Sequence, residues 1–313
     1  MATTIETPSG TGNARRLRDA ENFDRSNVSE LERSRTSTRI GLGIMTVLVI
    51  GLLAVISGGP LLWLAKSAVS TTEDIVQRPF ELWPSGIQWS NLADAWNQIR
   101  IGQYLANTLW IAIGNWFFGL LVALTGGYGL AILKPRYAKI VNAGVLATLF
   151  IPGVVSLISL YLTVLDMPII HLNLINTFWA VWLPAGASAF NLLLVSRFFA
   201  NLPGDVIEAA RIDGAGNFRI FASIVLPMSK PIIGVISLLT VVGAWKEFLW
   251  PLLVLPKAEL QPLSVGLYKV AETAPQSLLL AGMFISVIIP VALFLIFQRY
   301  FLRSAGQAGA TKG

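Results

Sequence analysis

The sequence predicts an all-α membrane protein with six transmembrane helices, and two observations support this fold class. Of the 313 residues, 54% are hydrophobic and only 13% are charged, whereas soluble domains carry about 25% charged residues. The charges are also confined to a few stretches of the chain, which leave long uncharged gaps between them. A helix needs roughly 20 apolar residues to cross a bilayer, and each gap is long enough.

Five of the predicted spans lie in uncharged gaps, and the sixth is interrupted only by Lys246 and Glu247. They form a membrane domain over residues 39–303, which a short tail, 304–313, follows. The preceding tail, 1–38, is polar and rich in Ser, Thr, Arg and Glu, a composition typical of disorder. The six predicted helices cover 40–64, 105–133, 140–164, 176–199, 232–255 and 279–300.

The positive charges predict the orientation of these helices. If the N-terminus is inside, 17 of the 23 Lys and Arg residues fall on inner segments. Positive residues favour the cytoplasmic side of a membrane. Both termini are therefore predicted to be cytoplasmic, in a multi-pass protein. The net charge of +6 is explained by basic residues beside apolar runs, so we expect contact with membrane lipid and not with nucleic acid.

Several kinds of site are excluded by residue counts and motifs. The chain has no cysteine and a single histidine, His171, so disulfides, thiolate metal sites and histidine clusters are impossible. It lacks a G-x-x-x-x-G-K-[ST] sequence and therefore a phosphate-binding P-loop. We expect no metal, no catalytic residue and no nucleotide in this chain.

Proline and glycine within the spans predict bends and close contacts. Pro152 with Gly153 in the third span, and Pro184 with Gly186 in the fourth, can bend their helices around a cavity, although simple packing is the favoured interpretation of each pair. The Gly-Gly-x-Gly run at 126–129 in the second span permits close helix packing.

Residues 201–230 form a polar, helix-prone island between two apolar segments. Asp205 is placed to cap a short helix, with Glu208 three residues on, as in a capping box. Gly214 favours a left-handed turn that ends this helix. A second short helix then runs from about residue 216 until Pro227 breaks it. The spacing therefore predicts a helix–turn–helix elbow on the inner side of the membrane.

The elbow contains three sequence blocks at characteristic spacing: Glu-Ala-Ala at 208–210, Asp-Gly-Ala at 213–215 and Leu-Pro at 226–227. Together these blocks resemble the coupling loop in membrane subunits of bacterial binding-protein-dependent ABC importers. The resemblance is greatest to the carbohydrate-uptake branch of the maltose type, and it covers roughly residues 40–303. It implies the type I ABC importer architecture and a location in the bacterial plasma (inner) membrane.

The resemblance implies a permease subunit whose elbow fits a groove on a separate ATPase subunit. The chain then needs no cofactor, because ATP and Mg²⁺ bind to the ATPases. The implied partners are a second homologous permease subunit, two ATPase subunits, an extracytoplasmic solute-binding protein and a sugar or oligosaccharide. The segments 66–100 and 256–276 are candidates for contact with the binding protein. The ATPase-coupling residues carried over by position are Glu208, Ala209, Ala210, Asp213, Gly214, Leu226 and Pro227.

The charged pair within the fifth span is the starting point for the translocation pathway. A charge at the bilayer centre costs about 2.5–3.5 kcal/mol on insertion scales, so it usually faces a cavity or a partner. Related subunits carry Trp-Asn-(Asp/Glu)-Phe here, so Glu247 matches and Lys246 departs. Alternatively, Lys246 snorkels to the interface and Glu247 makes a purely structural contact. Two asparagines within apolar spans complete the candidate pathway residues, which are Trp245, Lys246, Glu247, Asn115 and Asn191.

Three other functions compete with a sugar importer. A stand-alone secondary transporter or channel would show several buried ionisable residues or inverted repeats, and one such pair and no clear repeat are found. A membrane enzyme would need clustered catalytic side chains, and none is found. An ABC importer of another solute, such as a polyol or a glycerol phosphate, fits the same residues.

Overall fold

The computed structural model describes residues 36–310, and this range folds into helices joined by loops, without a β-strand. The chain forms two compact units that divide between Leu62 and Trp63, inside helix α3 (Thr36–Ala68). Most of the predicted polar tail, residues 1–35, lies outside the described residues, and residues 36–38 begin α3. The predicted tail 304–313 continues helix α17 as far as Ala310, and residues 311–313 are again outside the described range.

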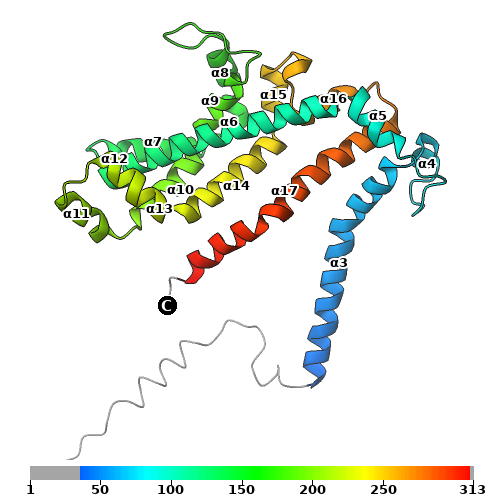
Figure 1. Ribbon diagram of the computed structural model, residues 1–313, viewed down its shortest axis with the longest axis horizontal. Helices are drawn as coiled ribbons and strands as arrows, with labels where there is room; N and C mark the ends of the chain where they lie inside the picture. Colours follow the sequence, from blue (N-terminus) through cyan, green and yellow to red (C-terminus); the bar gives the residue numbers. More distant parts are fainter. Residues whose placement is uncertain (1–35, 311–313) are drawn as a thin grey trace, which may run out of the picture. The chain divides into compact units, whose positions relative to one another are not determined.

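The six predicted spans fall mainly on helices (Figure 1). By length and composition, Ile40–Ala68, Ile101–Leu133 and Trp179–Ala200 are each sufficient to cross a membrane. Two bent helix pairs pass the same test, and the apolar stretch Gln276–Ala292 of α17 is somewhat shorter. The longer helices are α6 (Ile101–Tyr128) with the π-helix η1 (Gly129–Leu133), α7 (Ala138–Thr148), α8 (Gly153–Leu165), α9 (Trp179–Gly186), α10 (Ala189–Ala200), α14 (Lys230–Lys246) and α17 (Gln276–Ala310).

The short helices lie between these longer ones. They are α4 (Thr72–Gln77), α5 (Ser90–Gln98), α11 (Gly204–Ile212), α12 (Asn217–Ile220), the π-helix η2 (Phe221–Val225), α13 (Leu226–Met228), α15 (Leu249–Val254), the 3-10 helix η3 (Ala258–Leu260) and α16 (Leu263–Val270).

The third span is bent, and the fourth is interrupted between α9 and α10. Helices α7 and α8 meet at 110°, and Pro152 directly precedes α8. Proline lacks the backbone N–H that a continuous helix would need there. In the fourth span Pro184 lies inside α9, which ends two residues later. The hydroxyl of Ser188 then accepts from the N–H of Asn191 at 3.3 Å and caps α10.

The predicted fifth span, 232–255, is wrong as a single helix. Helix α14 ends at Lys246, Glu247 adopts an extended backbone, and α15 begins at Leu249. Pro251 explains the break, because a proline ring collides with the carbonyl four residues earlier in a helix. That carbonyl belongs to Glu247, which instead accepts a hydrogen bond from the Ser264 hydroxyl at 2.9 Å.

Helix α6 is the centre of the larger unit, and three buried clusters lie along it. Tyr128 at its C-terminal end packs with residues of α10 and α14. Ile111 near its middle packs with residues of α9, α14 and α15. Ile101 at its start packs with residues of α16 and α17. Because lipid tails are as apolar as these side chains, close packing is what favours such helix contacts in a membrane.

Two of the three glycines in the 126–129 run permit close helix contact, as predicted. A Cβ at Gly126 would lie 2.6 Å from Leu192, and one at Gly127 would lie 2.6 Å from Val195, both on α10. Gly129 does not serve this purpose, because a Cβ there would meet nothing within 4 Å. It begins the π-helix η1 instead.

Candidate functional site

The turn of the elbow is built as the sequence predicts. Helix α11 ends at Ile212, and Gly214 has φ +77°, in the left-handed region. The N–H of Ala215 donates to the carbonyl of Ala210 at 2.9 Å, and the N–H of Gly214 donates to that of Arg211 at 3.1 Å. These two bonds define a Schellman motif, which satisfies the last carbonyls of a helix. The motif depends on a residue that tolerates positive φ at position 214.

The predicted capping box at the start of α11 is wrong. The N-cap residue is Pro203, and its side chain makes no capping bond. Asp205 lies one position inside the helix, in its first turn, so its carboxylate is not placed to cap. A negative charge in the first turn still interacts favourably with the helix dipole. Glu208 is left exposed on the elbow surface.

The second arm of the elbow ends later than predicted. It runs through α12, η2 and α13 to Met228, and the chain bends by 78° at Ser229 before α14 begins. Pro227 lies within α13 and does not terminate it. The π-helical turn offers a reason, because the N–H of Leu226 bonds the carbonyl of Phe221, five residues back. Because a π-helical turn is wider than an α-helical one, Pro227, which has no N–H to donate, fits there without ending the helix.

The elbow presents one face to the protein and one to its surroundings. Ile207, Ala210 and Ile220 are buried and pack in the cluster around Tyr128. The Tyr128 hydroxyl donates to the carbonyl of Asn217 at 3.0 Å, which attaches the elbow to the end of α6. Of the predicted coupling residues, Ala210 therefore faces inward and Leu226 is partly buried. The exposed ones are Glu208, Ala209, Asp213, Gly214 and Pro227.

Two exposed apolar side chains beside the turn were missed by the sequence analysis. Ile212 is 87% exposed and Phe218 is 81% exposed, one on each side of Gly214. Large apolar side chains exposed together often mark an interaction surface. The available signal was an apolar residue next to the turn in each arm of an otherwise polar island.

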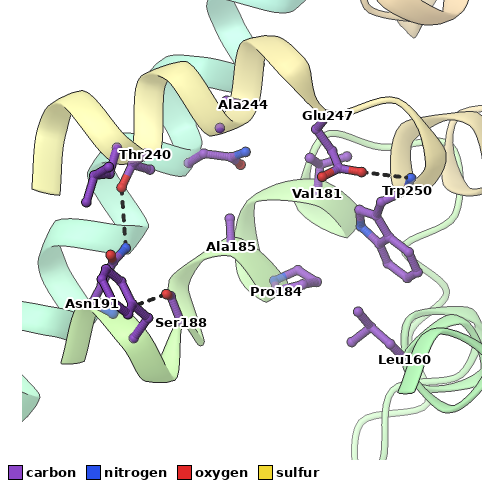
Figure 2. Close-up of a pocket in the computed structure, with 14 residues that line it drawn as sticks. Leu160, Val181, Pro184, Ala185, Ser188, Asn191, Thr240, Ala244, Glu247 and Trp250 are labelled. Carbon is purple, nitrogen blue, oxygen red and sulfur yellow. Dashed lines mark hydrogen bonds between the residues drawn. The ribbon is translucent and has the colours of Figure 1, made fainter. Parts of the chain in front are cut away.

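A cavity of about 490 Å³ lies between α6, α8, α9, α10, α14 and α15 (Figure 2). Its wall combines aliphatic side chains with amide, hydroxyl and carboxylate groups and one indole ring. Neither Lys nor Arg is among its lining residues. The lining residues are Asn115, Leu160, Val181, Pro184, Ala185, Ser188, Phe190, Asn191, Leu239, Thr240, Gly243, Ala244, Glu247 and Trp250.

The polar groups of the cavity are held in place by hydrogen bonds. The Asn191 amide donates to the Thr240 hydroxyl at 3.4 Å, and the Glu247 carboxylate accepts from the N–H of Trp250 at 3.3 Å (Figure 2). Asn115 is only 7% exposed, and its Oδ1 has no hydrogen-bond partner among the described residues. A buried, unpaired amide oxygen is costly in the absence of a partner.

The structure brings together three of the five candidate pathway residues. Asn115, Asn191 and Glu247 line the cavity, although they come from α6, α10 and the end of α14. Trp245 and Lys246 are not among the lining residues. Trp245 packs against the cluster around Ile101, and Lys246 is exposed.

Helix geometry explains this division. The cavity is lined from α14 by residues 239, 240, 243, 244 and 247, a spacing that keeps one face of a helix. Residues 245 and 246 point elsewhere. Sequence analysis missed Thr240, which lies on this face seven residues before Glu247, and Trp250, which follows the helix break. The signal in the sequence was the seven-residue spacing from Glu247, which places Thr240 on the same face of a helix.

A group of hydrogen bonds lies at the opposite end of α6 from the elbow. Asn107 donates to the carbonyls of Glu259 at 2.7 Å and of Gln261 at 2.9 Å. The Thr108 hydroxyl accepts from the N–H of Leu263 at 2.8 Å. These bonds attach residues 259–263 directly to α6, within the segment 256–276 that is a predicted contact for the binding protein.

Comparison with known proteins identifies the class of this chain. The chain is 31% identical over 258 residues to a probable ABC transporter permease, YurM, of Bacillus subtilis, covering 81% of this chain and 83% of the relative. It is 28% identical to the diacetylchitobiose uptake system permease NgcG of Streptomyces coelicolor, over 79% and 82% of the two chains. It is 29% identical to the sn-glycerol-3-phosphate transport system permease UgpE of Yersinia pestis, over 85% and 96%.

A solved structure has the same fold. It is described as a bacterial ABC transporter involved in the import of the acidic polysaccharide alginate, and one of its chains matches with a TM-score of 0.76. The match covers 85% of this chain and 98% of that chain at 22% sequence identity.

The fold and the elbow define a membrane-embedded transport subunit. The profile of the binding-protein-dependent transport system inner membrane components matches residues 117–306, and the chain belongs to this family. It is therefore a permease of an ABC importer in the inner membrane, a transport subunit and not an enzyme. It acts with other components of the importer and with a binding protein.

Proposed function

We propose that this chain forms half of the pathway through which an ATP-driven importer moves a sugar or oligosaccharide. The observation that supports this best is the cavity, whose one wall holds the amides of Asn115 and Asn191, a carboxylate at Glu247 and the indole of Trp250. These groups suit hydroxyl-rich molecules, which hydrogen-bond to amides and carboxylates and stack on aromatic rings. The opposite wall comes from a second, homologous permease subunit.

The charge of the cavity favours a neutral solute over an anionic one. The relatives include permeases named for diacetylchitobiose and for sn-glycerol-3-phosphate. A phosphate group calls for Arg, Lys or backbone N–H donors, whereas Glu247 is the only ionisable residue on this wall. A carboxylate in the pathway disfavours a phosphorylated solute by charge repulsion. The partner subunit and the binding protein contribute further selectivity.

The elbow is the proposed attachment for the ATPases. Two ATPase subunits bind ATP and Mg²⁺, and one of them receives this elbow through Glu208, Ala209, Asp213 and Gly214. Ala210, Leu226 and Pro227 hold the two arms of the elbow in shape. This assignment places the elbow and both termini in the cytoplasm, and the segments 66–100 and 256–276 on the side of the binding protein.

Purification from native membranes tests this function. The tagged chain should bring with it an ATPase, a second permease subunit and, in the presence of solute, a binding protein. Gly214→Val should lose the ATPase, because a β-branched residue at positive φ costs roughly 1–2 kcal/mol or more and opens the turn. Gly204→Ala is the control. Gly204 lies in helix α11, and a Cβ there would meet nothing within 4 Å.

Two other results would contradict parts of this proposal. Recovery of the chain alone, with solute transport after reconstitution in the absence of ATP, would contradict the importer and favour a secondary transporter. An ATPase retained by Gly214→Val at the level of Gly204→Ala would remove the elbow as the attachment while leaving the importer in place.

A further inference from the structure

Two adjoining hollows lie at the end of α6 that bears the elbow. The first has a volume of about 430 Å³, and its lining includes Lys134, Arg136, Lys139 and Asn142. The second has a volume of about 380 Å³, and Asn142 lines it too. Because they share this residue, the two hollows adjoin at Asn142. Neither contains a residue of the proposed coupling surface.

The first hollow is strongly cationic. Lys134 and Arg136 come from the short connection between η1 and α7, and Lys139 lies in the first turn of α7. In the connection Lys134 has φ 46°, and the N–H of Ala138 bonds the carbonyl of Pro135 at 2.8 Å. No Asp or Glu lines this hollow. In residues 36–310 the ion pairs join Arg78 to Glu81 and Asp166 to His171, so none of the three cations is neutralised within the described chain.

The second hollow is an apolar groove between α7 and α10. Its walls are mainly aliphatic, with Leu146 and Leu149 on one side and Leu193 and Leu194 on the other. Leu146 and Leu149 are each 46% exposed. Arg197 lines the groove and adds a fourth positive charge. A cationic hollow that opens into an apolar groove matches a molecule with an anionic head and a hydrocarbon chain.

The position of the cationic hollow along the span also matches that of a lipid head group. The cationic hollow follows directly after Leu133, the last residue of a span, and Tyr137 beside it is 63% exposed. Tyrosine is enriched at the membrane–water interface. Positive residues are expected on the inner side in any case, but that rule does not require three of them to surround one hollow beside an acyl-sized groove.

We propose that these hollows bind an anionic phospholipid of the inner leaflet. Its phosphate lies among Lys134, Arg136 and Lys139, Asn142 donates to its glycerol or ester oxygens, and one acyl chain occupies the α7–α10 groove. Basic pockets between transmembrane helices on the cytoplasmic side are suited to such head groups. Placing this site on the cytoplasmic side of the membrane rests on the proposed function, because the proposed function places the elbow in the cytoplasm.

Native mass spectrometry of the whole importer, supplied with equal amounts of phosphatidylglycerol and phosphatidylcholine, tests this site. The wild-type complex should retain phosphatidylglycerol preferentially. Lys134→Gln with Lys139→Gln should reduce this preference by about 10- to 30-fold, since each basic residue near a membrane surface is worth about fivefold in affinity. Lys257→Gln with Lys269→Gln removes the same charge near the opposite end of α6 and should leave the preference unchanged.

A second variant tests the groove independently of charge. Ala143 lines the groove, and Ala143→Trp should reduce retention of both lipids while every cation remains. Equal binding of the two lipids by the wild-type complex would overturn the proposal. So would displacement of phosphatidylglycerol by inorganic phosphate alone, which would indicate a simple anion site. The lipid preference of the wild-type complex and its response to inorganic phosphate test the proposal even if the lysine variant fails to assemble.

The same preparations separate this inference from the proposed function. The chain has no cysteine, so Ala143→Cys provides a single attachment point in it. Efficient cross-linking from this position to the second permease would show that protein covers the groove, and would overturn the lipid site only. Loss of the ATPase from a wild-type complex that still prefers phosphatidylglycerol would count against the proposed function only.

Discussion

Asp74 shows how a single carboxylate organises the 66–100 segment. It is buried, and its Oδ2 accepts from the hydroxyl of Ser85 at 2.7 Å and from the N–H of Ser85 at 3.1 Å. The hydroxyl of Thr71 in turn accepts from the N–H of Asp74 at 3.1 Å and caps α4. The Ser85 hydroxyl bond is the main cause that lowers the pKa of Asp74 below its ordinary value.

This lowered pKa predicts an acid-sensitive loop. Because the folded pKa of Asp74 lies below the ordinary value of about 3.9, its stabilisation is complete above that pH and is lost as the pH falls through the folded pKa. Asp74→Asn should therefore increase hydrogen exchange over residues 71–88 at neutral pH and abolish the acid dependence. Glu73→Gln, exposed on the same helix, should change neither. An unchanged exchange profile for Asp74→Asn would contradict this role.

The exposed pair Ile212 and Phe218 leads to a second prediction at this scale. If they anchor the elbow in the ATPase, Phe218→Ala should weaken ATPase retention about tenfold or more, because buried aromatic anchors cost 1–2 kcal/mol or more when truncated. The permease itself should unfold at the same temperature, because Phe218 is 81% exposed. Phe80→Ala, which removes a ring that is 93% exposed from the 66–100 segment, is the control. Full ATPase retention by Phe218→Ala would exclude the ring as an anchor.

At the scale of elements, the contact between α6 and α10 depends on the absence of side chains. A Cβ at Gly127 would lie 2.6 Å from Val195 and 3.2 Å from the backbone nitrogen of Ser196. Since the backbone cannot rotate away as a side chain does, the helices would have to separate. Gly129, two residues further along at the start of η1, has no such contact.

Gly127→Ala should therefore destabilise the protein by about 1–3 kcal/mol, the usual cost of overpacking. Thermal unfolding of the purified permease in detergent measures this loss. Gly129→Ala, two residues further along, should shift the unfolding temperature little. Similar shifts for both variants would mean that loss of glycine flexibility, and not the contact with α10, is responsible.

Elements also show how far the sequence determines the structure. The spans were predictable because charges are excluded from the hydrocarbon core, and the elbow turn because Gly214 suits positive φ. The fifth span was predicted too long because the effect of Pro251 on the carbonyl of Glu247 was not weighed. The N-cap was misplaced because Asp205 and Pro203 both suit the start of a helix, and only backbone geometry distinguishes them.

The cavity was less predictable, for a different reason. Thr240 and Asn191 lie 49 positions apart and meet only once α10 and α14 are packed. Which face of α14 is inward depends on its neighbours, so the sequence did not separate Glu247 from Lys246. The apolar groove likewise takes shape only when α7 packs beside α10.

For the whole molecule, the central question is whether the cavity selects and passes the solute. Glu247→Gln keeps the size of the side chain and removes its charge. We expect solute uptake to fall about tenfold or more, in line with the 1.5–3 kcal/mol of a hydrogen bond to a charged group. Assembly and ATP hydrolysis should remain, since Glu247 lies at the opposite end of α14 from the elbow. Unchanged uptake in reconstituted vesicles would remove Glu247 from the pathway.

The attachments at the two ends of α6 have a consequence for how such importers diverge. Through Tyr128 and Asn217 this helix is bonded to the elbow, and through Asn107 and Glu259 to the segment assigned to the binding protein. With η1 it spans 33 residues, about 50 Å of helix. A tilt that suits one partner therefore displaces the surface offered to the other. Adaptation to a new binding protein then constrains the ATPase proposed to bind the elbow on the opposite face. The genes for these two partners should therefore tend to change together.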